Sequence, residues 1–367
     1  MNLDNLKITT RVSLPESPMP ISIIGAGGIV EDAHLPAYQQ AGFPVKGIYD
    51  IKSEKAGQLA QDFNIPLSCE SMEDLIKQTS SEGVYDVAVP ASQIPTVLKE
   101  LPEGSAVLIQ KPLGENLQQA RYIRQLCEEK NITAGVNFQL RYAPFVVAAR
   151  DLIDRRLLGE VHDVEVRLNV HTPWQNWTFL QALPRVEILY HSIHYLDLIR
   201  SLLGDPGGVY AKTVRHPQKT ELASTKSSVI LDYGDHIRAT ISTNHDHAFG
   251  SRHQESFVKL EGTGGAVKFT MGVNMNYPEG REDQFEYCLA SGETNSDPGW
   301  RSVDIPGSWF PEAFMGSMGS FQCWLQGTGE AFTSTLTDAE QTMALVEAAY
   351  RSSAEGVTPI STGNRKQ

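Results

Sequence analysis

The sequence predicts two domains: an α/β domain with a doubly wound parallel sheet, followed by an α+β domain with an open, mostly antiparallel sheet. The chain has 367 residues, more than a single hydrophobic core usually supports. Up to about Ala143, short apolar runs alternate with helical patterns, which is typical of a parallel sheet covered on both faces. Beyond that point, strands with period-two alternation prevail. We expect a loose arm at 1–19, the first domain at 20–143 and the second at 144–367.

The first domain is predicted to hold parallel strands joined by helices. Short apolar runs of β type occupy residues 21–24, 45–49, 84–89, 106–109 and 133–136. A helix-like stretch lies between most neighbouring runs, and right-handed crossovers of this kind build a doubly wound sheet. Ligands of such sheets collect at the carboxyl ends of the strands, so the residues that follow these runs are candidates for function.

The second domain is predicted to be an open sheet with helices on one face. Period-two alternation indicates a strand at 161–170 and further strands between residues 208 and 269, with a hairpin turn at 261–265. A strongly apolar helix is expected over 187–203, because Gly204 ends its pattern. The remaining helices are expected at 144–158, 315–325 and 338–353.

The first apolar run ends in closely spaced glycines, as dinucleotide-binding sites do. Gly25 permits a tight turn, Gly27 lets the backbone approach a pyrophosphate, and the next helix directs unpaired N–H groups at that anion. Val30 takes the third position of the motif, which weakens a helix-packing role but not the phosphate contact. Asp50 ends the second run, where a carboxylate accepts hydrogen bonds from the adenosine ribose. The alternative is an ordinary turn with a solvated aspartate.

The acidic composition argues against several classes of partner. A formal net charge of -13 and a pI near 5.3 disfavour nucleic acids and anionic membranes, which are bound by basic surfaces. Residues 1–20 contain no apolar segment like that of a signal peptide, and the four cysteines form no C-x-x-C pair. We expect a cytoplasmic protein that acts on a small molecule, with no nucleic acid or membrane as partner.

Over essentially its whole length the sequence resembles the Gfo/Idh/MocA oxidoreductases. The signatures that carry the resemblance are Gly-Ala-Gly-Gly-Ile-Val-Glu-Asp-Ala-His-Leu-Pro at 25–36, Gln-Lys-Pro-Leu at 110–113, Gly-Val-Asn-Phe-Gln-Leu-Arg-Tyr-Ala-Pro at 135–144, and the segments 194–205 and 348–356. The resemblance implies a Rossmann domain, a nicotinamide cofactor and hydride transfer at a carbon bearing a hydroxyl or carbonyl, commonly on a sugar or polyol. We also expect a homodimer or homotetramer that assembles through the second sheet.

Lys111 is the first catalytic candidate. It follows Gln110, just after the fourth apolar run and at the carboxyl end of a predicted strand, and Pro112 fixes the backbone after it. An ammonium beside a bound alcohol stabilises an alkoxide, and a cationic nicotinamide nearby lowers the pKa of the lysine. Without the resemblance, a solvated charge would be the simpler interpretation. The cofactor-binding candidates are Gly25, Gly27, Gly28, Ile29, Asp50, Pro90 and Lys111.

One side of the predicted helix 187–203 carries a polar cluster. Its members recur at three- and four-residue steps: Glu187, Tyr190, His191, His194 and Asp197. By the resemblance, His194 matches the family's catalytic histidine, and Tyr190 stands where the family usually has an assisting aspartate. We assign proton transfer to His194 and Tyr190. His191 is a substrate-binding candidate and the alternative partner of His194.

Further substrate-binding candidates are Arg141, in the third signature, and Trp174 and Trp177, in the loop before that helix. Loop tryptophans often present flat apolar faces to sugar C–H groups, although these two could instead anchor the loop to the core. His245 and His247 alternate on one strand face and could suggest a metal site together with His191 and His194. No carboxylate or cysteine completes a ligand spacing around them, so no metal is predicted.

These observations predict an NAD-dependent dehydrogenase of a sugar or polyol. The carboxylate of Asp50 would repel a 2′-phosphate and no arginine follows it, which favours NAD, while Lys52 keeps NADP open. One alternative is an NAD-dependent glycosidase of the same superfamily, which oxidises a sugar carbon transiently. The other is a nucleotide-sensing protein without catalysis, which the presence of both Lys111 and His194 disfavours.

Overall fold

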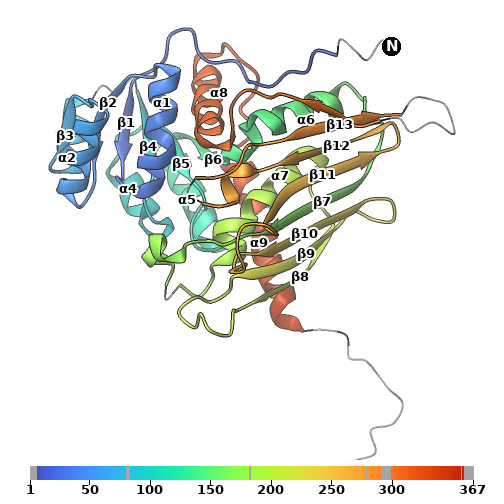
Figure 1. Ribbon diagram of the computed structural model, residues 1–367. Coiled ribbons are helices and arrows are strands. Elements are labelled where there is room, and N and C mark those ends of the chain that lie inside the picture. Colours follow the sequence, from blue (N-terminus) through green and yellow to red (C-terminus); the bar gives the residue numbers. More distant parts are fainter. Residues whose placement is uncertain are drawn as a thin grey trace, which may run out of the picture.

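Two sheets lie side by side in the computed structural model, which describes residues 6–79, 83–181, 183–277, 279–290, 299–356 and 358. A six-stranded sheet comes from the first part of the chain and an eight-stranded sheet from the second (Figure 1). The predicted fold class is confirmed, since the first sheet is doubly wound and the second is open and mostly antiparallel.

The first sheet is parallel throughout, in the order β3-β2-β1-β4-β5-β6. Its strands are β1 (Ile21–Ile24), β2 (Val45–Tyr49), β3 (Leu67–Cys69), β4 (Val84–Val87), β5 (Ala106–Gln110) and β6 (Thr133–Asn137). The order reverses between β1 and β4, and sheets of this kind bind ligands in the crevice outside that switch point. The sequence prediction missed β3, because three residues at a sheet edge carry too little alternation to be recognised.

Helices pack on both faces of the first sheet and join its strands (Figure 1). They are α1 (Leu35–Ala41), α2 (Ser53–Asp62), α3 (Met72–Gln78), α4 (Ile94–Glu100) and α5 (Leu117–Glu129). Side-chain caps start two of them: Ser71 accepts a hydrogen bond from the N–H of Asp74, and Asn116 accepts one from the N–H of Gln119. The cap at Asn116 fixes where the segment after β5 turns into α5.

The second sheet has the order β14-β13-β12-β11-β7-β10-β9-β8, and only the pair β7 and β10 is parallel among the pairs described. Its strands are β7 (Val161–Asn169), β8 (Gly208–Val214), β9 (Lys226–Asp232), β10 (Arg238–Asn244), β11 (Glu255–Gly262), β12 (Gly265–Thr270), β13 (Phe285–Leu289) and β14 (Arg301–Val303). The predicted hairpin joins β11 to β12, with Gly262 paired to Gly265.

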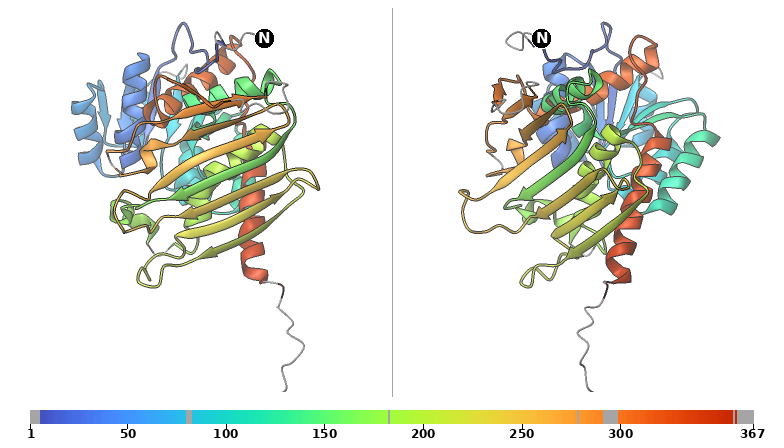
Figure 2. Two further views of the ribbon diagram at one scale, coloured as in Figure 1. Left: turned by 45° about the vertical axis from the view of Figure 1, so that its right-hand side comes forward. Right: turned by 90° about the vertical axis from the view of Figure 1, so that its right-hand side faces the viewer.

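Helices cover one face of the second sheet and leave the other open (Figure 2). These are α6 (Pro144–Asp154), α7 (Ile193–Leu203) and the long α9 (Leu336–Glu355). Alternate strand residues point into the core they share, such as Val164, Val166 and Leu168 of β7. In the final part of the chain, α8 (Phe314–Gln326) returns to the first domain and contacts α1 and β6. The two sheets are therefore tied together by the end of the chain.

The N-terminal arm was expected to be loose, but its described part, from Leu6 onward, is packed. The Oε1 of Gln322 on α8 accepts a hydrogen bond from the N–H of Met19. A Cβ at Gly319 of α8 would stand 2.5 Å from Leu14, so the absence of a side chain at this glycine makes room for the arm to pack against α8. No helix in the described parts of the chain is long and apolar enough to cross a membrane.

Candidate active site

The glycine-rich turn lies at the switch point of the first sheet. Gly25 has a φ of +112°, and a Cβ there would stand 2.3 Å from the carbonyl oxygen of Ala88, just after β4, so only glycine fits. At Gly27 a Cβ would meet no atom within 4 Å, which leaves room for a pyrophosphate against the backbone. Val30 opens the π-helical turn Val30–His34 and is fully buried, so a branched side chain fills the packing position of the motif.

Asp50 links the end of β2 to this turn. One carboxylate oxygen accepts a hydrogen bond from the N–H of Ala26 at 2.7 Å, and the other accepts one from the N–H of Lys52 at 2.8 Å. The carboxylate thus stands beside the glycine-rich turn, as the sequence prediction requires of a ribose ligand. Ile29 precedes the π-helical turn, and Pro90 is exposed after β4 at the same edge of the sheet. These residues fit a dinucleotide.

Lys111 joins the two domains at the carboxyl end of β5. Its Nζ donates a hydrogen bond to the backbone carbonyl of Tyr190, 2.8 Å away. Tyr190 belongs to the π-helical turn Ile188–Ser192 that precedes α7, and such turns recur at functional sites. Burial disfavours the ammonium and lowers the pKa of Lys111 to about 7. This amine can therefore gain or lose a proton near neutral pH.

His191 and His194 lie close enough to Lys111 for their charges to interact. Burial, followed by nearby positive charge that includes Lys111, lowers the pKa of both imidazoles well below the usual value. His194 is 8% exposed, its ring meets Trp309 edge-on at 5.2 Å, and its Nδ1 is buried without a hydrogen-bond partner. A buried polar atom without a partner is costly, so a ligand oxygen that bonds to it would relieve that cost.

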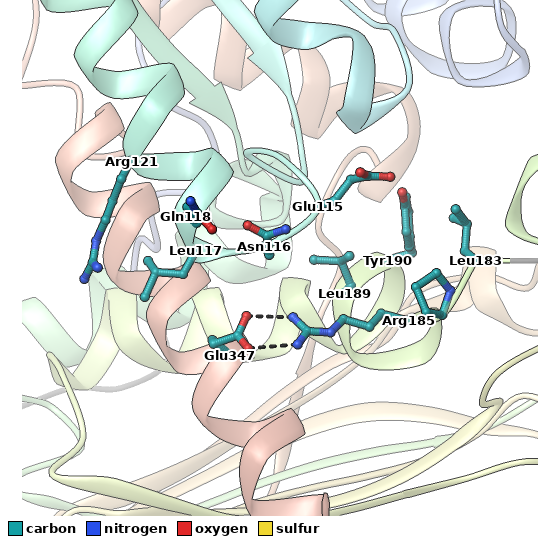
Figure 3. Close-up of a pocket in the computed structure, with 11 residues that line it drawn as sticks. Glu115, Asn116, Leu117, Gln118, Arg121, Leu183, Arg185, Leu189, Tyr190 and Glu347 are labelled. Carbon is teal, nitrogen blue, oxygen red and sulfur yellow. Dashed lines mark hydrogen bonds and ion pairs between the residues drawn. The ribbon is translucent and has the colours of Figure 1, made fainter.

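The side chain of Tyr190 lines a pocket whose lining residues do not include Lys111, His191 or His194. The pocket has a volume of about 670 Å³, and its wall also includes Glu115 and Leu183 (Figure 3). Burial and the nearby Glu115 raise the pKa of Tyr190 to about 12. In the same pocket, Arg185 and Glu347 form a bidentate ion pair. Among the described residues the Nδ1 of His194 has no hydrogen-bond partner, so the Tyr190 hydroxyl is not bonded to that nitrogen, as a relay through it would require.

Arg141 does not face the site, contrary to the sequence prediction of a substrate contact. Its guanidinium is buried and binds both oxygens of Asp197 on α7. It also donates to Asp338 on α9 and to the carbonyl of Thr333. With its donors committed to these groups, Arg141 has a structural role. The signature around it identified a fixed point between helices, not a ligand site.

The two predicted tryptophans occupy different places. Trp174 is buried, and its ring meets His191 edge-on at 5.1 Å and His245 at 5.5 Å. Trp177 is partly buried and lies 5.7 Å from the ring of Tyr277. Trp174 therefore forms a wall of the site, whereas Trp177 packs on a loop of the second domain.

Two residues of the site received no catalytic role from the sequence. Glu187 is fully buried one turn before His191, and the ring of His245 lies 4.4 Å from that of His191. The helical spacing of Glu187 was a signal, whereas His245, just after β10, had been grouped with the histidines of the helix only as a possible metal ligand. His247 instead lies against Phe249. Among the described residues, no three His, Cys, Asp or Glu are arranged to hold a metal ion.

Comparison with known proteins gives matches in both domains. Residues 19–138 match the Gfo/Idh/MocA model described as an oxidoreductase family with an NAD-binding Rossmann fold, and residues 146–268 match the Gfo/Idh/MocA C-terminal domain. The chain is 25% identical to an uncharacterized protein of Saccharomyces cerevisiae, YMR315W, over 68% of this chain and 74% of that protein.

Two further proteins are similar to the chain. A D-xylose 1-dehydrogenase (NADP(+)) of Haloarcula marismortui is 23% identical, over 77% of this chain and 86% of that protein. The fold is similar to that of levoglucosan dehydrogenase in complex with NADH and levoglucosan, with a TM-score of 0.74 and 19% identity, over 92% of this chain and 98% of that chain.

Proposed function

The chain belongs to the Gfo/Idh/MocA oxidoreductase family, and from this premise we propose that it is an NAD(P)-dependent dehydrogenase acting on a CH–OH group of a sugar or polyol. One observation carries the proposal: the buried amine of Lys111 stands with His191 and His194 at the carboxyl end of β5, beside the dinucleotide-binding turn. A proton-transfer group with a pKa near neutrality, here Lys111, suits the conversion between an alcohol and a carbonyl.

Lys111 is the proposed group that exchanges the hydroxyl proton. A neutral amine keeps N–H donors, one of which can hold the Tyr190 carbonyl, and has a lone pair that can accept a proton. Once protonated, the ammonium stabilises negative charge on the substrate oxygen. The buried Nδ1 of His194 is the proposed second contact to that oxygen. The nicotinamide, when bound, supplies the acceptor or donor of the hydride.

NAD is the proposed cofactor in preference to NADP. The carboxylate of Asp50 is held at the end of β2 by two backbone N–H groups, so it cannot turn away from a 2′-phosphate without losing both hydrogen bonds. Lys52 lies two residues further on, and its N–H donates to the same carboxylate. The similarity to an NADP(+)-dependent D-xylose 1-dehydrogenase keeps both cofactors in the experiments.

The proposed function is tested by absorbance at 340 nm with NAD+ or NADP+ and a panel of D-xylose, levoglucosan, D-glucose and myo-inositol. Net reduction of the cofactor with one of these supports a dehydrogenase. Release of an aglycone from nitrophenyl glycosides without net reduction would instead indicate the glycosidase. Cofactor binding without turnover of any compound would indicate the sensor. The Lys111→Met variant is the control for turnover that does not depend on the site.

A further inference from the structure

An indole N–H lies beside His194 without a hydrogen-bond partner. Trp309 is 4% exposed, and its ring meets the imidazole of His194 at right angles, with the two ring centroids 5.2 Å apart. The Nε1 of Trp309 is buried, and none of the described residues accepts a hydrogen bond from it. An indole nitrogen can only donate, so this group lacks an acceptor that a ligand could bring.

Local contacts hold Trp309 in this place. Gly307 has a φ of +98°, and a Cβ there would stand 2.7 Å from the side chain of Glu312. The carboxylate of Glu312 accepts hydrogen bonds from the N–H of Ser308 at 2.9 Å and from the side-chain amide of Gln40, on α1, at 3.0 Å. The segment just before the indole is therefore tied to a helix of the first domain.

The turn that begins with Trp309 connects the two parts of the proposed active site. The π-helical turn Trp309–Ala313 packs against the turn Val30–His34, which follows the dinucleotide-binding glycines. The indole itself contacts His194 on α7. Trp309 is thus placed where the cofactor-binding domain and the helix of the proposed proton-transfer group come together.

The unpartnered nitrogens around the imidazoles share one requirement. The Nε1 of Trp174, whose ring meets that of His191, and the Nδ1 of His194 are also buried without a partner in the part of the chain that the structure describes. Both indoles are donors, so a ligand that satisfies them must carry acceptor oxygens. The hydroxyls of a sugar or polyol supply such oxygens, whereas a ligand that lacks one leaves a buried donor unpaired.

We propose, on the basis of the proposed function, that the Nε1–H of Trp309 donates a hydrogen bond to the oxygen on the carbon next to the reacting one, so that the site selects vicinal hydroxyls. Lys111 and His194 hold the reacting hydroxyl. Because the rings of His194 and Trp309 are in contact, oxygens on adjacent carbons can each be reached by one of their nitrogens. Trp309 is a specificity-determining residue and exchanges no proton with the substrate.

The contact is tested first by the indole N–H signals in proton–nitrogen NMR spectra of the full chain, which has five tryptophans. Trp309→Phe identifies the signal of Trp309 by its loss. With NADH bound, so that no alcohol is oxidised, addition of D-xylose, levoglucosan, D-glucose or myo-inositol should move this signal downfield. The signal of Trp324, whose ring packs against Phe332, should stay in place. A Trp309 signal that none of these compounds moves, even if NADH alone has moved it, would overturn the proposal.

Kinetics with whichever compound reduces the cofactor provide the second readout. Trp309→Phe keeps an aromatic ring beside His194 and removes the N–H, so KM should rise roughly five- to tenfold while kcat changes less than about twofold. Trp324→Phe is the matched control and should change neither constant. For the deoxy analogue that lacks the hydroxyl beside the reacting carbon, Trp309→Phe should change KM by less than about twofold, because the acceptor is already absent. An equal rise in KM with both compounds would indicate a packing role and contradict the contact.

The inference and the proposed function fail in different ways. If no compound reduces the cofactor while one of them moves the Trp309 signal, the proposed function fails and the contact stands. If a compound reduces the cofactor and none moves the signal, the dehydrogenase stands and the contact is overturned.

Discussion

At the scale of single residues, Lys111 has the sharpest consequence for activity. Lys111→Met removes the amine and keeps its length, so turnover should fall roughly a hundredfold or more while NAD affinity changes little. Because the pKa of Lys111 lies at about 7 and oxidation needs the neutral amine, wild-type kcat for oxidation should rise as the pH passes through 7. Stopped-flow rates and a fluorescence titration of NAD measure both. Normal turnover in the variant would refute the assignment.

Burial of Lys111 should also lower the stability of the folded protein. Its folded pKa lies below the unfolded value, so the folded state binds fewer protons and the penalty for burying the ammonium is relieved as the pH rises above 7. Lys111→Met should therefore raise the melting temperature most below pH 7, and this gain should shrink toward pH 10.

Asp50 tests the choice of cofactor. Asp50→Ala removes the carboxylate that is proposed to bind the ribose and that also accepts from Ala26 and Lys52, so NAD should bind at least several-fold more weakly. The affinity for NADP should fall less, because the substitution also removes the repulsion between the carboxylate and the 2′-phosphate. Tryptophan fluorescence titrations with both cofactors give the two ratios. A wild-type preference for NADP would contradict our interpretation of this strand end.

A substitution at Tyr190 can show whether its hydroxyl or only its backbone carbonyl contributes to activity. The Lys111 contact uses the Tyr190 carbonyl, and the phenol lies in the pocket with Glu115, so Tyr190→Phe should keep turnover within about threefold and stability within about 1 kcal/mol. A fall of tenfold or more would instead return the hydroxyl to the proton relay proposed from the sequence. Steady-state rates and melting temperatures of the variant distinguish the two.

At the scale of elements, Arg141 fixes α7 against α9. Arg141→Ala would leave Asp197 as a buried charge without its partner, at a cost of about 3–5 kcal/mol in unfolding free energy. The matched control is Arg124→Ala, whose ion pairs with Glu128 and Glu340 lie nearer the surface and should contribute less than about 1 kcal/mol. Urea unfolding measures both. Similar losses of unfolding free energy in the two variants would show that the buried ion pair contributes no more stability than the exposed one.

The sequence predicted elements where a local pattern was strong. The apolar helix and the hairpin at β11 and β12 follow from periodicity and glycine placement, which are properties of short segments. Local patterns do not predict the short edge strand β3, or the division of the helix into a π-helical turn and α7. Packing against neighbouring elements determines both features. The same holds for the site, where spacing found His194 but not the contact of Glu187 with His245.

At the scale of the whole molecule, the open face of the second sheet bears on assembly. Tyr210 of β8 is 66% exposed and Ile230 of β9 is 50% exposed, and the two are paired across neighbouring strands. Further along the same register lie polar and charged residues, Thr240, Glu165 and Lys259. Apolar side chains bordered by charge on an uncovered sheet are typical of a surface that meets another protein.

We therefore expect a homodimer or homotetramer that buries this face against a second copy of the chain. A two-fold interface pairs residue i of one copy with residue j of the other and j with i, so the two Ile230 side chains meet where they lie near the axis. There Ile230→Lys would bring like charges together and place a charge against apolar side chains. Light scattering after size exclusion should show wild type as an oligomer and Ile230→Lys as a smaller species. Gln61→Lys, at an exposed position of α2 in the first domain, is the control for added charge alone. Because the helices of the active site lie on the opposite face of this sheet, the smaller species should still bind NAD. A monomeric wild type, or an Ile230→Lys protein of unchanged mass, would contradict an interface at β8 and β9.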